Sequence, residues 1–216
     1  MALSITVIGS TGLIGKQFLE SIQPDDYAEV IAITRRSIPS LDEKPFIRQA
    51  IHDFTDIEQM RLDLKTDVLV CALGTTIKTA GSQDAFMRVD HDLPLAIARM
   101  ALEEGCKRMV VISSVGGRVD SSNFYLRVKG LLEDELSALG FEQLHILKPS
   151  MLLGDREETR AGESVGKLII KPLSFIIPWK FKPIHATTVA ATIHRSIQSV
   201  QAGKHIWEGK PLFTGN

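Results

Sequence analysis

Residues 5–15 read Ile-Thr-Val-Ile-Gly-Ser-Thr-Gly-Leu-Ile-Gly, and the fold class is first indicated by this segment. Its first half is a β-branched apolar run, which is typical of a buried strand. Its second half carries Gly9, Gly12 and Gly15 and leads into apolar residues at helical spacing. A glycine turn between a strand and a helix lets an anion approach the backbone, where free N–H groups and the positive end of the helix attract it. The segment therefore predicts a pyrophosphate-binding site.

The loop differs from two other phosphate-binding sequences. Thr11 stands where the motif G-x-G-x-x-G has its middle glycine, and no Gly-Lys-Ser/Thr ending follows as it does in a P-loop. An NTPase is therefore disfavoured. A nucleotide-cofactor site and a tight strand-to-helix turn without a ligand remain as alternatives, and the position after the first strand favours the cofactor.

The rest of the chain alternates short apolar runs with helical patterns. Strands are expected at residues 5–8, 30–33, 46–51, 68–70, 109–112 and 144–147. Because strand and helix alternate, the strands pair in parallel by crossovers and helices cover both faces. The fold class is therefore α/β, with a doubly wound parallel sheet.

The alternation of strand and helix patterns stops near the carboxyl end. Residues 149–183 contain several prolines and are expected to form a small cap on a single domain spanning 1–216. One more helix is predicted after the cap, with Val189, Ile193 and Val200 on one face.

Composition excludes several classes of protein. The chain has 25 Lys and Arg against 26 Asp and Glu, a formal net charge of −1. It therefore lacks the excess of positive charge that is typical of nucleic-acid-binding proteins. Two cysteines and six scattered histidines lack metal-ligand spacing, so no metal is expected. Prolines interrupt the apolar residues 168–179, which excludes a membrane span, and the absence of a secretory pattern predicts a cytoplasmic protein.

Two arginines follow the second strand. Arg35 lies twenty residues beyond Gly15, where an NAD site usually carries an acid for the ribose hydroxyl. Arg35 and Arg36 instead present planar donor groups that suit a 2′-phosphate, so NADP(H) is favoured as cofactor over the alternative of two solvated loop arginines. After the third strand, Asp53 either meets the adenine amino group or caps the helix beginning near Ile57.

The residues expected to carry chemistry lie after the fifth strand. Tyr125 and Lys129 are four residues apart, which puts them on one face of a helix. An ammonium beside a phenol stabilises the phenolate and makes the hydroxyl a usable acid or base. Ser113 and Ser114 end the strand, and a serine hydroxyl there can donate to a substrate carbonyl. The plain alternative is an amphipathic helix that buries Tyr125 in a core stripe.

The order of glycine loop, strand-end serine and Tyr-x-x-x-Lys resembles the atypical branch of the short-chain dehydrogenase/reductase superfamily. Residues 73–76, 88–90, 121–130 and 155–160 are similar to the Tat-interacting-protein oxidoreductase family. The similarity runs from residue 5 to about residue 160. It implies a Rossmann-like NAD(P)-binding fold.

The resemblance also implies roles for individual residues. It makes Tyr125 the proton donor and Lys129 its electrostatic partner, with Ser114 preferred to Ser113 as the catalytic serine. The positions that the resemblance implies to contact NADP(H) are Thr11, Leu13, Ile14, Arg35, Arg36, Leu73, Gly74, Tyr125, Lys129, Leu152 and Arg160. The residues themselves add Gly9, Gly12 and Gly15 of the glycine turn, and Asp53.

Three functions compete at this point. The first is an NADPH-dependent reductase that transfers hydride to the carbonyl of a small-molecule substrate. The second is a regulator that senses NADP(H) without turnover and acts through a protein partner, whose surface the sequence does not show. The third is a nucleotide-sugar epimerase, and Arg35 and Arg36 count against its NAD requirement.

Overall fold

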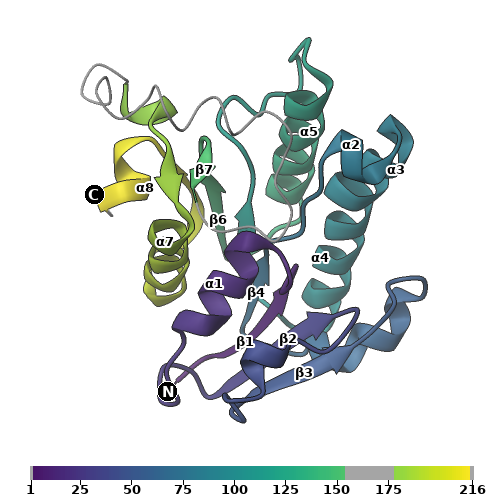
Figure 1. Ribbon diagram of the computed structural model, residues 1–216, viewed down its shortest axis with the longest axis vertical. Helices are drawn as coiled ribbons and strands as arrows, with labels where there is room; N and C mark the ends of the chain where they lie inside the picture. The colour runs from purple at the N-terminus through teal and green to yellow at the C-terminus, as the bar shows by residue number, and fades with distance from the viewer. Residues whose placement is uncertain (1, 154–177, 215–216) are drawn as a thin grey trace.

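A seven-stranded parallel sheet forms the centre of the protein, which we describe from a computed structural model covering residues 2–153 and 178–214 (Figure 1). The strand order is β3-β2-β1-β4-β5-β6-β9. The strands of this sheet are β1 (Ser4–Ile8), β2 (Glu29–Thr34), β3 (Ile47–Ile51), β4 (Val68–Cys71), β5 (Arg108–Ile112), β6 (Gln143–Lys148) and β9 (Gly203–Glu208). The prediction of a doubly wound parallel sheet is confirmed.

Helices cover both faces of this sheet (Figure 1). The α-helices are α1 (Leu13–Ser21), α2 (Ile77–Ala80), α3 (Gln83–Met87), α4 (Leu93–Glu103), α5 (Phe124–Ala138), α7 (Ala186–Gln198) and α8 (Lys210–Thr214). Short 3₁₀ turns are η1 (Pro39–Leu41), η2 (Ile57–Leu64) and η5 (Trp179–Phe181), and η3 (Arg88–Asp92) is a π-helical turn.

Two apolar layers hold the sheet between the helices. In β1, Ile5 and Val7 point to the layer that contains α1 and α7, whereas Ile8 points to the layer that contains α4 and α5. The same alternation runs through the central strands, which are buried on both faces. This is why continuous apolar runs predicted them correctly.

The structure differs from the sequence-based predictions at two places near the carboxyl end. β9 was not predicted, because Gly203–Glu208 lies at the sheet edge and mixes polar with apolar residues. Val200 was predicted on the buried face of α7, but the helix ends at Gln198 and Val200 is 88% exposed. The backbone turns extended at Ser199, so the helical period no longer applies to Val200.

Part of the expected cap at residues 149–183 lies within the described residues. β7 (Leu152–Leu153) pairs in parallel with β8 (Ile184–His185), and η5 comes just before β8. This two-stranded sheet brings Leu152 to the carboxyl end of the main sheet. Arg160 lies outside the described residues.

Candidate functional site

A cleft of about 450 Å³ opens at the carboxyl ends of β1, β4 and β5. The strand order reverses direction between β1 and β4, and such a switch point leaves a crevice above the strand ends. The residues that line the cleft are Gly12, Leu13, Ile14, Ala72, Leu73, Gly74, Thr75, Asp90, Ile112, Ser113, Ser114, Val115, Tyr125, Lys129, Pro149, Ser150, Met151 and Leu152. Most of the predicted site residues therefore meet in one place.

The glycine turn forms one wall of this cleft. Gly9 has φ +81°, and a Cβ on it would lie 2.4 Å from the backbone carbon of Ala72. A Cβ on Gly15 would lie 2.3 Å from the carbonyl oxygen of Gly9. Gly9 and Gly15 thus allow the turn, the helix and β4 to pack closely, while Gly12 faces the cleft.

The amino end of α1 points its backbone into the same cleft. Gly12 is the N-cap and supplies no side-chain hydrogen bond, so within the described residues no side chain caps the first N–H groups of the helix. Leu13 and Ile14 line the cleft, whereas Thr11 is exposed and lies outside the lining. Free N–H groups at a helix start attract anions, so this wall suits a phosphate.

A buried ion pair stands behind the opposite wall. The Lys129 ammonium lies 2.7 Å from Oδ1 of Asp90, and the two side chains are 4% and 1% exposed. Burial lowers the pKa of Lys129, but Asp90 and then Tyr125 raise it by more, so its pKa lies above the usual value. Lys129 is therefore held in its charged form beside the cleft.

Asp90 was missing from the predicted site. Its second oxygen accepts a hydrogen bond of 2.8 Å from the backbone N–H of Thr75, which follows β4. Asp90 sits in the π-helical turn η3, where Leu93 N–H donates to Arg88 O. The only signal in the sequence was residues 88–90, which entered as part of a family resemblance without a role.

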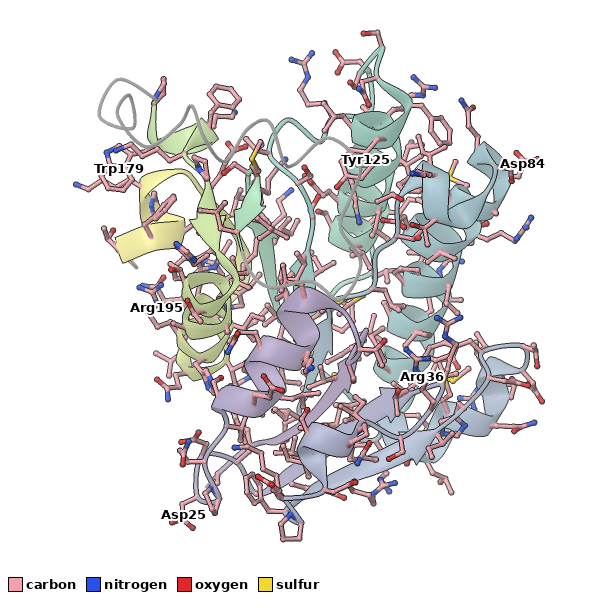
Figure 2. The ribbon with its side chains drawn as sticks, viewed as in Figure 1. Asp25, Arg36, Asp84, Tyr125, Trp179 and Arg195 are labelled. Atoms are coloured by element: carbon pink, nitrogen blue, oxygen red, sulfur yellow. The ribbon has the colours of Figure 1, made fainter. Side chains whose placement is uncertain are left out.

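Tyr125 occupies the first turn of α5, which Asn123 caps through a hydrogen bond from Leu126 N–H. Its side chain is half-buried, lines the cleft and packs against Phe86 with ring centroids 5.6 Å apart. Figure 2 shows Tyr125 on α5, well separated from Arg36 at the end of β2. The ring does not lie in the core stripe that the alternative interpretation of this helix required.

The two serines after β5 differ in their hydrogen bonds. Ser113 is buried, and its hydroxyl donates to Oε1 of Glu133. The other oxygen of Glu133 lies 2.8 Å from the Lys148 ammonium, which also donates to Gly117 O. Ser114 is half-buried, and among the described residues its hydroxyl has only a 3.4 Å contact with Val115 O. The Ser113 proton is therefore already directed away from the cleft.

The arginines and Asp53 lie outside the cleft lining. Arg35 and Arg36 are exposed after β2, and neither makes an ion pair within the part of the chain that the structure describes. Asp53 accepts hydrogen bonds from Thr55 N–H and Oγ1–H, which lower the pKa of its carboxyl. The residue that caps η2 is Asp56, so the capping alternative for Asp53 is wrong.

The remaining predicted positions on β4 and the cap reach the cleft. Leu73 and Gly74 follow β4, and Leu152 belongs to β7. A Cβ on Gly74 would lie 3.5 Å from Asp90 Oδ1. Because Gly74 has no side chain, none stands between the ion pair and the cleft at this position.

Residues 2–153 and 178–214 contain neither a metal-binding cluster nor a membrane-spanning helix. No group of three or more His, Cys, Asp or Glu side chains is arranged to hold a metal ion. No helix in these ranges has the length and apolar character needed to cross a bilayer.

Comparison with known structures shows the fold. The structure of MoeE5 in complex with UDP-glucose and NAD matches with a TM-score of 0.72 at 15% identity, covering 94% of this chain and 74% of that one. A dTDP-4-dehydrorhamnose reductase from Bacillus anthracis in complex with NADP matches with a TM-score of 0.66 at 15% identity, covering 96% and 75%. The fold is thus the Rossmann-like fold of NAD(P)-binding epimerases and reductases.

Two proteins of known name are similar to this chain over about three quarters of its length. Protein HTATIP2 of Rattus norvegicus is 36% identical over 164 residues, which cover 74% of this chain and 67% of the relative. Protein FMP52, mitochondrial, of Saccharomyces cerevisiae is 35% identical over 164 residues, covering 75% and 71%. These matches bear out the predicted family resemblance.

The same relatives correct one prediction. The expectation of a cytoplasmic protein is contradicted, because similar fungal proteins are named as mitochondrial. The sequence profile of the HIM1 family matches residues 37–180, more than half of the chain. Together with the relatives, this match shows that the chain belongs to the HIM1 family.

Proposed function

We propose that this chain is an NADPH-dependent oxidoreductase of the short-chain dehydrogenase/reductase type, which transfers hydride to the carbonyl group of a small molecule. One observation carries the proposal. The glycine turn, Ser114, Tyr125 and Lys129 come from distant parts of the sequence and line a single cleft. A tight turn or an ordinary amphipathic helix requires no such convergence.

The cleft fits a dinucleotide at its phosphate end. A side chain at Gly9 would collide with the backbone after β4, and the start of α1 presents N–H groups without a side-chain cap. Leu13 and Ile14 would hold the diphosphate there. Arg35 and Arg36 would bind the 2′-phosphate from the end of β2, since their guanidinium groups make no ion pair with other described residues. An extended cofactor suits the separation between Arg36 and Tyr125 in Figure 2.

The residues on the opposite wall would perform the acid–base step. When bound, the nicotinamide supplies the hydride. Tyr125 would donate its hydroxyl proton to the substrate oxygen, a role supported by its half-buried position in the lining of the cleft. The Lys129 cation stabilises the phenolate that remains, and Asp90 keeps Lys129 charged and in place.

The hydrogen bonds favour Ser114 over Ser113 as the group that orients the carbonyl. A serine hydroxyl has one proton to donate, and Ser113 gives its proton to Glu133. Ser114 has no comparable acceptor within the described residues, so its proton is available to a substrate oxygen. Ser114→Ala should lower kcat by about 100-fold, whereas Ser113→Ala should affect it much less.

Tyr125→Phe is the main test. This substitution keeps the ring and its packing on Phe86 but removes the proton. We expect unchanged NADPH binding, measured by thermal stabilisation, and loss of turnover on any carbonyl substrate found by screening for NADPH oxidation. Full turnover by the variant would exclude Tyr125 as the acid.

Cofactor preference needs its own measurement. NADPH should raise the melting temperature more than NADH at equal concentration, and Arg35→Ala with Arg36→Ala should remove the difference. Equal stabilisation of the unmodified protein would refute the 2′-phosphate assignment. Binding of NADPH with no turnover across a broad substrate panel would favour the sensing function instead.

A further inference from the structure

The last strand of the sheet has an unpaired edge within the described residues. β9 pairs in parallel with β6, and no other described strand pairs with it. Gly203 N–H donates to Glu142 O at 2.7 Å, and a parallel ladder repeats every second residue. The backbone N–H and C=O groups of Lys204, Ile206 and Glu208 therefore face away from β6.

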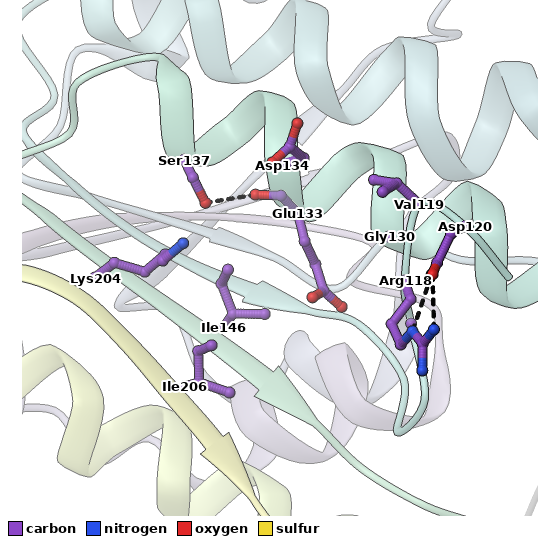
Figure 3. Close-up of a pocket in the computed structure, with 11 residues that line it drawn as sticks. Arg118, Val119, Asp120, Gly130, Glu133, Asp134, Ser137, Ile146, Lys204 and Ile206 are labelled. Atoms are coloured by element: carbon purple, nitrogen blue, oxygen red, sulfur yellow. Dashed lines mark hydrogen bonds and ion pairs between the residues drawn. The ribbon is translucent and has the colours of Figure 1, made fainter.

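The side chains at these three positions share one face of the strand. Ile206 is 54% exposed, which is unusual for a large apolar side chain in a sheet. Lys204 lies on one side of it and Glu208 on the other, two residues away in each direction. Figure 3 shows Lys204 and Ile206 projecting from β9 toward α5.

A hollow of about 360 Å³ lies between this edge and α5 (Figure 3). Lys204 and Ile206 line it from β9, and Ile146 lines it from β6. Val119, which is 47% exposed, lines it from the loop before α5. Charged side chains, among them Arg118, Glu133 and Asp134, line the hollow as well, so it offers a surface of mixed polarity beside the strand edge that a partner can cover.

We propose that β9 is an interface at which two copies of this chain pair edge to edge, antiparallel, about a twofold axis through Ile206. In this register Ile206 stands opposite Ile206 of the second copy. Lys204 stands opposite Glu208 of the second copy, and Glu208 opposite Lys204. The outward N–H and C=O groups of these residues then bond between copies, and the two sheets become one.

The charge pattern selects a second copy of this chain as the partner. An edge strand that only guards against association carries like charges or proline, which repel any second copy. β9 instead carries one cation and one anion at equal distances from an exposed isoleucine, which is self-complementary in an antiparallel pair. Glu208 already contacts Lys180 at 3.1 Å, and Lys204 makes no ion pair with any described residue, so the pairing adds a partner for Lys204.

Charge reversal tests this register. The wild-type chain should have twice its mass of 23.8 kDa by light scattering at about 100 μM. Lys204→Glu and Glu208→Lys should each weaken the dimer about tenfold or more, because each variant places like charges opposite one another at two positions. An equimolar mixture of the two variants should regain the dimer, since each supplies the charge that the other lacks.

Lys65→Glu is the matched control. It makes the same charge change at an exposed residue before β4, away from β9, and should leave the dimer intact. Circular dichroism and thermal unfolding confirm that each variant is folded. A monomeric wild type, dimers that survive both reversals, dissociation by the control, or a mixture that stays monomeric would each overturn the proposal.

Discussion

The buried ion pair between Asp90 and Lys129 predicts a large, specific effect of a single substitution. Asp90→Asn preserves the shape of the side chain and an oxygen that accepts from Thr75 N–H, but removes the charge. At 2.7 Å the attraction is about 6 kcal/mol with an effective dielectric constant of 20. Because part of that attraction only offsets desolvation, we expect the free energy of unfolding at pH 7 to fall by about 3–5 kcal/mol.

The double variant distinguishes a charge effect from lost packing. Lys129→Met replaces the ammonium by an apolar chain of similar length, so adding it to Asp90→Asn removes the unpaired charge. Urea denaturation should show that the double variant is more stable than Asp90→Asn alone. Asp120→Asn is the control, because it breaks an exposed ion pair with Arg118 and should have no measurable effect.

The stability deficit of Asp90→Asn, which is the difference between its free energy of unfolding and that of the wild type, should also depend on pH. In the wild type the pKa of Lys129 is raised, so the ammonium persists in the folded state above pH 10. Without Asp90 the effect of burial dominates and the pKa falls below its unfolded value of about 10.4. The variant then gains stability as pH rises from 7 to about 10, and the deficit shrinks. A loss below about 1 kcal/mol, or a deficit that grows with pH, would refute this account of the pair.

Three other predictions concern the scaffold. Gly9→Ala should reduce the free energy of unfolding by about 2–4 kcal/mol, whereas Gly140→Ala, also at positive φ but with open space around it, should cost about 1 kcal/mol by urea denaturation. Phe18→Ala should cost about 3–5 kcal/mol by the same measurement, because Phe18 is fully buried. Burial lowers the pKa of His145 to about 4. As pH falls from 6.5 to 4, the free energy of unfolding of the wild type should therefore fall by about 3 kcal/mol more than that of His145→Asn, and equal losses would contradict this. Asparagine is the replacement because its side-chain oxygen can still accept a hydrogen bond from Trp207.

The sequence predicted the central strands and the location of the cleft for a clear physical reason. Strands buried on both faces consist of continuous apolar runs, and motif residues that follow such strands must lie at one edge of a parallel sheet. β9 escaped prediction because an edge strand has fewer apolar positions. Val200 was misplaced because its apolar spacing continues past the end of α7, where only the backbone at Ser199 shows the change of direction.

The carboxylate partner of Lys129 was not predictable in the same way. The spacing to Tyr125 predicted a role for Lys129, but Asp90 lies 39 residues away in the chain and no motif links the two residues. Glu133 and Lys148 form a second, largely buried pair, which joins α5 to the end of β6, whereas Asp90 and Lys129 join η3 to α5. Pairs of this kind depend on how two elements meet in space, and a single sequence carries no record of that meeting.

The π-helical turn η3 has a consequence for changes in chain length. A residue advances about 100° around an α-helix, so the extra residue in η3 shifts the angular position of everything on one side of it. With this shift, Phe86 and Asp90 both face inward while α4 keeps its apolar face on the sheet. Deleting one residue after Asp90 would restore a regular helix and yet turn Phe86 and Asp90 together by about 100° relative to α4, away from their inward positions. The irregular backbone is therefore the arrangement that keeps both inward, and a shorter, more regular helix would be the damaged form.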